Sequence, residues 1–110
     1  MENSLWAAHF SSSIGWFGQG VITLNDNIVS GGNSEFFYLG TFSIDSSNNV
    51  KAKIFVKNFT EPAQSILGNL NEYTAEFSGH YYDSQMKLKA VVKEDPSKHI
   101  SVFLRKIADL

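Results

Sequence analysis

The sequence contains no cysteine. This absence excludes a disulfide framework and any metal site built on thiolates, so the domain must be stabilised by its core. Long apolar runs are also missing, since none approaches the ~18 residues of a membrane span. The N-terminal stretch "MENSLWAAHFSS" lacks the basic and apolar regions of a signal peptide. Together these absences predict a cytoplasmic protein.

A surplus of positive charge is absent too. Nine basic side chains face eleven acidic ones, which gives a formal net charge of -2. No summed positive field therefore attracts a phosphate backbone, and direct nucleic-acid binding is disfavoured. The lysines fall mostly at two-residue spacing, as on the solvent face of a strand. They are Lys51, Lys53, Lys57, Lys87, Lys89 and Lys93.

Residues that build a β core are abundant. The 110 residues are 43% hydrophobic and include nine phenylalanines, enough for a single domain spanning 1–110. Apolar and polar residues alternate with a period of two, most clearly from Val50 to Lys57. About eight such strands are separated by short turns, so neighbouring strands should pair antiparallel. A β-sandwich and a closed up-and-down barrel both fit, and closure favours the barrel because it removes exposed edges.

Two local features refine this all-β, eight-stranded antiparallel up-and-down barrel. Pro62 and Gly68 bracket a short stretch that predicts one helix near 62–67, placed to cover an open end of the barrel. Gly31 and Gly32 precede an aromatic strand, and we expect them to adopt backbone angles that other residues avoid. The turn would direct Phe36 and its neighbours Tyr38 and Phe42 to one side.

Catalytic and metal-binding patterns are weak. The glycines of "GWFGQG" are followed by a strand and not by the helix that a phosphate loop needs. His9, His80 and His99 are widely separated, and the acidic pairs fall in turns. We therefore expect a protein that is not an enzyme and has no cofactor or metal.

Two binding roles remain open. The inward aromatic residues should fill the barrel, or alternatively surround one small apolar ligand. They are Trp6, Phe10, Phe36, Tyr38, Phe42, Phe77 and Tyr81. Outward apolar residues indicate a binding surface, and a dimer interface is its simplest use. The main ones are Phe37, Leu39 and Phe55, joined by Phe59, Val91, Phe103 and Ile107.

The stretches "GQGVITLNDNIVSGGNSEFFYLGTFSIDSSNNVKAKIFVKNF" and "EPAQSILGNLNEYTAEFSGHYYDSQMKLKAVV" resemble GrlR-type negative regulators of type III secretion genes. The resemblance rests on an ordered series of glycines, aromatic residues and one proline. These are Gly20, Gly31, Gly32, Phe36, Tyr38, Gly40, Pro62, Gly68, Tyr73 and Gly79.

This resemblance implies a lipocalin-like barrel, usually dimeric, that binds and restrains a transcriptional activator and has no catalytic residues. The family loop associated with activator binding reads Glu-Asp-Glu-Asp, whereas the matching loop here, "SIDSSNNV", has only Asp45 as an acidic residue. The loop residues Asp45, Ser46 and Ser47 are therefore candidate partner contacts. The leading hypothesis is a dimeric regulatory protein, and the alternative is a carrier of a small apolar ligand.

Overall fold

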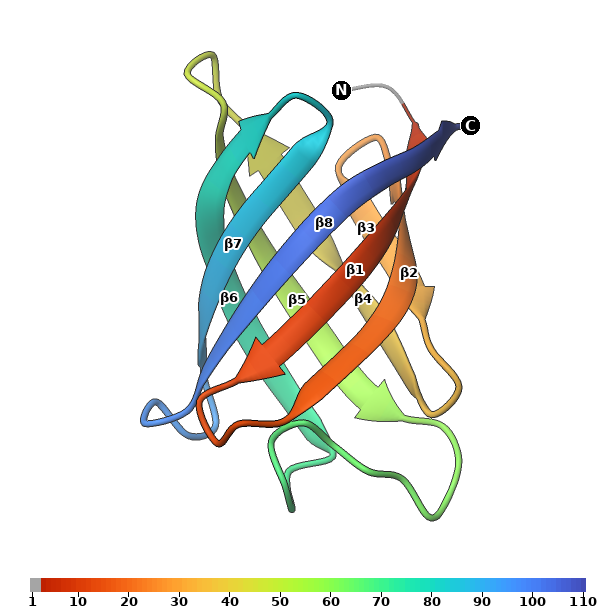
Figure 1. Ribbon diagram of the computed structural model, residues 1–110, viewed down its shortest axis with the longest axis vertical. Coiled ribbons are helices and arrows are strands. Elements are labelled where there is room, and N and C mark those ends of the chain that lie inside the picture. The colour runs from red at the N-terminus through yellow and green to blue at the C-terminus, as the bar shows by residue number, and fades with distance from the viewer. Residues whose placement is uncertain (1–2) are drawn as a thin grey trace.

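The protein is a closed antiparallel barrel of eight strands that follow one another in chain order (Figure 1). The computed structural model describes residues 3–110. The strands are β1 (Ser4–Ser12), β2 (Phe17–Asn25), β3 (Ile28–Gly32), β4 (Phe36–Ile44), β5 (Asn49–Asn58), β6 (Glu72–Tyr82), β7 (Gln85–Val92) and β8 (His99–Asp109).

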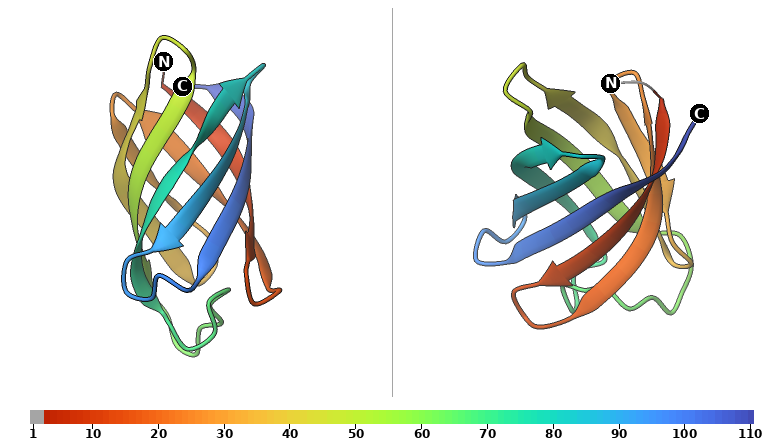
Figure 2. Two further views of the ribbon diagram at one scale, coloured as in Figure 1. Left: turned by 90° about the vertical axis from the view of Figure 1, so that its left-hand side faces the viewer. Right: turned by 45° about the horizontal axis from the view of Figure 1, so that its top comes forward.

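The wall closes where β1 pairs with β8, from Ser4 opposite Asp109 to Ser12 opposite Ile100, with a bulge beside Trp6. Both views in Figure 2 show strongly tilted strands around a single interior. Tilt and closure leave no free sheet edge along the barrel. The predicted all-β, antiparallel eight-stranded barrel is therefore confirmed.

Side-chain alternation explains why these residues form this wall. On β5, Val50, Ile54 and Val56 are buried, whereas the intervening Lys51 and Lys53 are exposed. On β7 every second residue from Met86 to Val92 is buried. Because successive side chains of a strand point to opposite faces, a period of two places one apolar set inside the barrel. The Lys-rich positions accordingly form part of its outer surface.

The paired glycines of β3 have a different role from the expected one. Neither Gly31 nor Gly32 has a positive φ, so the prediction of unusual backbone angles was wrong. A Cβ at Gly31 would lie 2.1 Å from the Val21 carbonyl oxygen, and one at Gly32 would lie 2.5 Å from the Phe36 oxygen. Glycine is needed here because backbones of neighbouring strands approach too closely for a side chain.

No part of residues 3–110 is helical, so the helix expected near 62–67 is wrong. The segment 59–71, which we call the strap, crosses one end of the barrel as an irregular chain (Figure 1, bottom). Its polar backbone groups bond to the barrel: the Ser12 hydroxyl donates to the Ile66 carbonyl (2.6 Å), and the Gln64 amide donates to Glu35 Oε1 (3.1 Å). These bonds replace those of a helix, which six residues are too few to sustain.

The strap also contributes to the core. Leu67 is completely buried, and Ile66 and Leu70 pack partly buried against the cluster of core side chains. A turn from Ser65 to Gly68 directs Leu67 inward, with the Gly68 amide donating to the Ser65 carbonyl and the Leu67 amide to the Ser65 hydroxyl. The expected covering of one barrel end is therefore present without a helix. Residues 3–110 include no helix long and apolar enough to cross a membrane.

Candidate functional site

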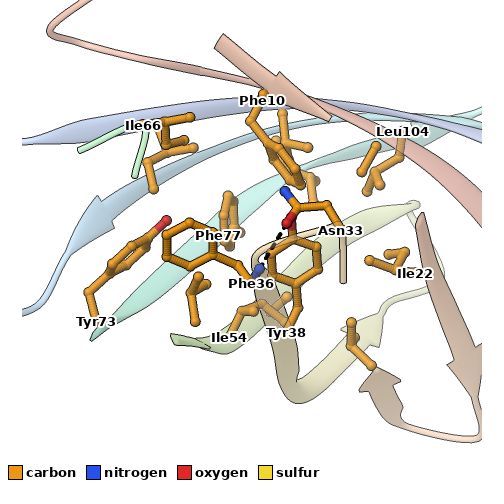
Figure 3. A pocket seen from close by; sticks show the side chains of 18 of the residues that line it. Phe10, Ile22, Asn33, Phe36, Tyr38, Ile54, Ile66, Tyr73, Phe77 and Leu104 are labelled. Atoms are coloured by element: carbon orange, nitrogen blue, oxygen red, sulfur yellow. Dashed lines mark hydrogen bonds between the residues drawn. The ribbon is translucent and has the colours of Figure 1, made fainter. Parts of the chain in front are cut away.

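The barrel interior holds a cavity of about 350 Å³ (Figure 3). Inward side chains from all eight strands line it, and they are joined at one end by Gln64, Ser65 and Ile66 of the strap. Five of the seven predicted inward aromatic residues contribute to the lining: Phe10, Phe36, Tyr38, Phe42 and Phe77. Protein interiors are normally packed as densely as organic crystals. Filling by side chains, one of the two expected outcomes, is thus incomplete.

The other two aromatic residues close the end opposite the strap. Trp6 is fully buried, and its indole N–H donates to the Ser4 hydroxyl at 2.8 Å. The ring of Tyr81 meets Trp6 edge-on at a centroid distance of 6.3 Å. Neither residue lines the cavity. The tryptophan therefore fills the barrel beyond the end of the cavity, as a floor to the chamber that lies between it and the strap.

Polar groups gather at the strap end of the cavity. Asn33 Oδ1 accepts hydrogen bonds from the amides of Glu35 and Phe36 (3.0 and 2.9 Å), so the turn before β4 fixes the position of its amide group (Figure 3). Glu35 is bonded in turn to the strap through Gln64. Asn33, Glu35 and Gln64 all line the cavity. Since they lie outside the strands, the two-residue periodicity gave no signal for them.

Two tyrosine hydroxyls add polar atoms to the apolar wall. Burial raises the pKa of Tyr38 to about 12, although the neighbouring Asn33 side chain partly offsets this effect. Burial also raises the pKa of Tyr73, and the nearby Tyr38 adds to the shift. Both hydroxyls are protonated at neutral pH, as an unperturbed tyrosine already is. Tyr73 falls on the inward face predicted for its strand but was not among the predicted cavity residues.

The Tyr73 hydroxyl is unusual because no hydrogen bond joins it to any other residue in the range 3–110, although the side chain is only 4% exposed. Its side chain projects into the cavity from β6 (Figure 3). The hydroxyl oxygen itself is reached from the cavity and still lacks a partner, since the fully enclosed side-chain atom without one among residues 3–110 is Asn71 Oδ1. The space in front of the Tyr73 hydroxyl is the cavity itself, so a bound molecule can supply that partner.

The charge of the lining is also one-sided. Among the described residues that line the cavity, Glu35 is acidic and none is Lys, Arg or His. The remainder of the wall is mainly aliphatic and aromatic. The chamber therefore offers dispersion contacts and a few hydrogen-bonding groups, without a cation to hold an anionic ligand.

The predicted outer apolar residues do come together. The rings of Phe37 and Phe55 meet edge to face at a centroid distance of 6.1 Å, and Leu39, 48% exposed, is the cross-strand partner of Phe55. Val21, also exposed, is in register with Phe37 through Gly32, which has no side chain to separate them. We call these four residues the outer patch.

The loop residues Asp45, Ser46 and Ser47 are exposed but lie apart from the outer patch. Asp45 is six positions beyond Leu39, or about 20 Å at the rise of an extended strand. Its carboxylate accepts bonds from the Asn49 amide (3.0 Å), the Asn49 side chain (3.1 Å) and the Ser47 amide (2.8 Å). These bonds, those from Asn49 foremost, lower the pKa of Asp45. The carboxylate thus orders its own turn.

The remaining outer candidates differ in exposure. Phe59, Val91 and Ile107 are exposed, and Phe103 is half-buried. Phe103 lies opposite His9 and Lys87, on the β1, β7 and β8 part of the wall. Phe103 is therefore on a different part of the wall from β4 and β5, which carry most of the outer patch.

No profile of a known protein family matches the chain, and a search of curated proteins gives no match. Its function must therefore be inferred from the chamber and the outer patch.

Proposed function

We propose that this protein is a non-enzymatic binding protein that holds one small, mainly apolar molecule inside its barrel. The observation that carries the proposal is the apolar chamber of about 350 Å³. Ligand pockets span ~300–1,000 Å³, so this chamber suits a compact ligand. Atoms that face a void lose their dispersion contacts, and a bound apolar molecule restores them.

A fluorescence titration tests this function. N-phenyl-1-naphthylamine is uncharged and brightens in apolar surroundings, so we expect saturable enhancement with one site per chain. In Ala52→Trp a large ring would occupy the chamber that Ala52 lines. This variant should lose the signal while remaining folded by circular dichroism.

Lys53→Trp is the matched control, because Lys53 is the next residue on β5 and faces outward. It carries the same new ring on the other face of the wall and should bind the probe like the original protein. Undiminished binding by Ala52→Trp, or equal loss in both variants, would contradict the location of the site.

A second candidate function rests on the outer patch. We propose that this patch joins two copies of the chain in a cytoplasmic homodimer that restrains a transcriptional activator, as the resemblance to GrlR-type regulators implies. Exposed apolar side chains that adjoin one another on a protein surface commonly mark an interface. The activator would contact Asp45, Ser46 and Ser47, because this loop matches the family's activator loop and lies outside the patch.

Analytical ultracentrifugation tests the dimer. Leu39→Lys places a charge at the centre of the patch and should convert a dimer to monomers. Lys51→Glu, at an exposed position of β5 beyond the patch, changes charge without touching it and should leave the dimer intact. Sedimentation of the original protein as a monomer at ~100 μM, a concentration at which a specific interface should hold, would count against the homodimer.

A further inference from the structure

The chamber also indicates which chemistry its occupant has. We propose that the ligand is an electrically neutral molecule, one chain or one small ring system ending in a hydroxyl, carbonyl or amide oxygen, and that the site discriminates against carboxylates such as fatty-acid anions. This inference rests on the proposed binding function and specifies its ligand class.

The first argument is the charge at the strap end. A carboxylate taken from water into an apolar chamber needs a cation or several donors to offset its lost hydration. The described lining provides no Lys, Arg or His, and its one charged residue, Glu35, has the same sign as the ligand would. Both the lost hydration and the repulsion from Glu35 therefore oppose a fatty-acid anion, whereas a neutral oxygen avoids both costs.

The second argument is the set of hydrogen-bonding groups. The Tyr73 hydroxyl has no partner among residues 3–110, and it is a donor at neutral pH, as any tyrosine hydroxyl is. A ligand oxygen that accepts from this hydroxyl would form a hydrogen bond that no group of the described chain makes with it. Tyr38 and Asn33 also line the chamber (Figure 3) and offer further polar contacts.

The third argument is shape. The end opposite the strap is closed by Trp6, and the walls between that floor and the strap are apolar. The polar residues Asn33 and Gln64 lie at the strap end. A ligand therefore fits with its apolar part toward the floor and its oxygen toward the strap. A chamber of about 350 Å³ has room for one such chain and not for a two-chain lipid.

The test is a competition against bound N-phenyl-1-naphthylamine at pH 7.5 with two ligands of equal chain length, 1-decanol and decanoate. We expect 1-decanol to displace the probe at a concentration at least tenfold below that needed for decanoate. An anion enters any apolar site less readily than a neutral molecule does. Two variants therefore separate the effect of this particular lining from the general preference of an apolar site for uncharged ligands.

Glu35→Gln keeps an oxygen for the Gln64 amide and removes the charge. It should improve decanoate binding up to about tenfold, with 1-decanol within twofold of its original value. Tyr73→Phe removes only the hydroxyl, which makes no bond to the described chain. It should weaken 1-decanol about fivefold and leave the affinity for the probe unchanged.

The outcomes are distinct. Decanoate binding as tightly as 1-decanol would overturn the inferred ligand class and leave the binding function standing. The same holds if neither variant changes the ratio of the two affinities. Absence of any binding by the probe and both ligands would overturn the binding function itself.

Discussion

Replacement of Trp6 by alanine provides a direct test of the barrel floor. Trp6 is fully buried and meets Tyr81 edge-on. Large aromatic side chains bury ~150–250 Å², which at ~25 cal/mol per Å² corresponds to about 4–6 kcal/mol. Measured losses for buried Phe or Trp replaced by Ala are about 3–5 kcal/mol. We therefore expect Trp6→Ala to lower the free energy of unfolding by about 4 kcal/mol, or about 16 °C in Tm for a domain of this size.

The chain provides its own control, because it has only two tryptophans. Trp16 lies in the turn between β1 and β2 and is 42% exposed. The same substitution there should cost less than about 1 kcal/mol, as is usual for surface positions. Thermal unfolding followed by far-UV circular dichroism compares the two variants. Fluorescence of Trp16→Phe, which leaves Trp6 as the sole tryptophan, should show blue-shifted emission that resists quenching by acrylamide.

Equal Tm losses for Trp6→Ala and Trp16→Ala would refute the reasoning, since the same atoms are removed and only their burial differs. Ready quenching of Trp6 in the folded Trp16→Phe variant would refute the closed floor by a separate route. If Trp6→Ala loses little stability while Trp6 emission is protected in Trp16→Phe, neighbouring side chains must collapse into the space that the indole leaves. The extent of this collapse is what makes the cost of such substitutions vary.

Three further predictions concern the wall. Ile54→Asp buries an unpaired carboxylate and should lower Tm far more than Lys51→Asp on the outward face of β5 in parallel thermal melts. Tyr38 has a folded-state pKa of about 12 against about 10 when unfolded. Between these values the unfolded chain loses the proton and the folded chain keeps it, so the free energy of unfolding should fall by about 1.4 kcal/mol per pH unit as the pH rises from 10 toward 12. Urea titrations of Tyr38→Phe should show a shallower decline. Gly79→Ala places a Cβ 2.0 Å from a β7 carbonyl oxygen and should destabilise more than Gly15→Ala. At Gly15 only the positive φ opposes a side chain, at a cost of about 1–2 kcal/mol. Equal urea midpoints for the two variants would show that the close approach at Gly79 relaxes freely.

Strand positions were predictable because each strand buries only one face. From Val50 to Lys57 the two-residue period allows only one assignment of side chains to the two faces of the strand that buries Ile54 and exposes Lys53. A shift by one residue would reverse both. Closure followed from the number of strands and the short turns. Neither inference needed any long-range contact to be known in advance.

The strap was mispredicted because local signals dominated the prediction. Pro62 and Gly68 are typical of helix ends, but the conformation depends on Ser12 and Glu35, which are distant in sequence and accept or donate the bonds that a helix would make internally. The polar end of the chamber was missed for a related reason. Asn33 and Glu35 lie in a turn, where alternation carries no information about which side chains face inward.

The two-residue periodicity also could not predict whether side chains fill the barrel or leave a cavity. Periodicity assigned Trp6 and Phe10 to the same inward face, yet Trp6 forms the floor and Phe10 lines the chamber. Their different depths depend on the strand register and on the bulge beside Trp6. Alternation specifies a face, whereas the free volume depends on the diameter of the closed barrel and on how side chains from different strands stagger.

The alternation along β4 and β5 also makes the two proposed functions separable. Tyr38 faces the chamber while its neighbours Phe37 and Leu39 face outward, and on β5 Ile54 and Phe55 divide in the same way. One backbone layer thus carries both surfaces. A substitution at Leu39 leaves every atom of the chamber lining in place, and one at Ala52 leaves the outer patch intact. Loss of ligand in Ala52→Trp with an unchanged dimer, together with loss of the dimer in Leu39→Lys with unchanged ligand affinity, would assign the two activities to opposite faces of the same two strands.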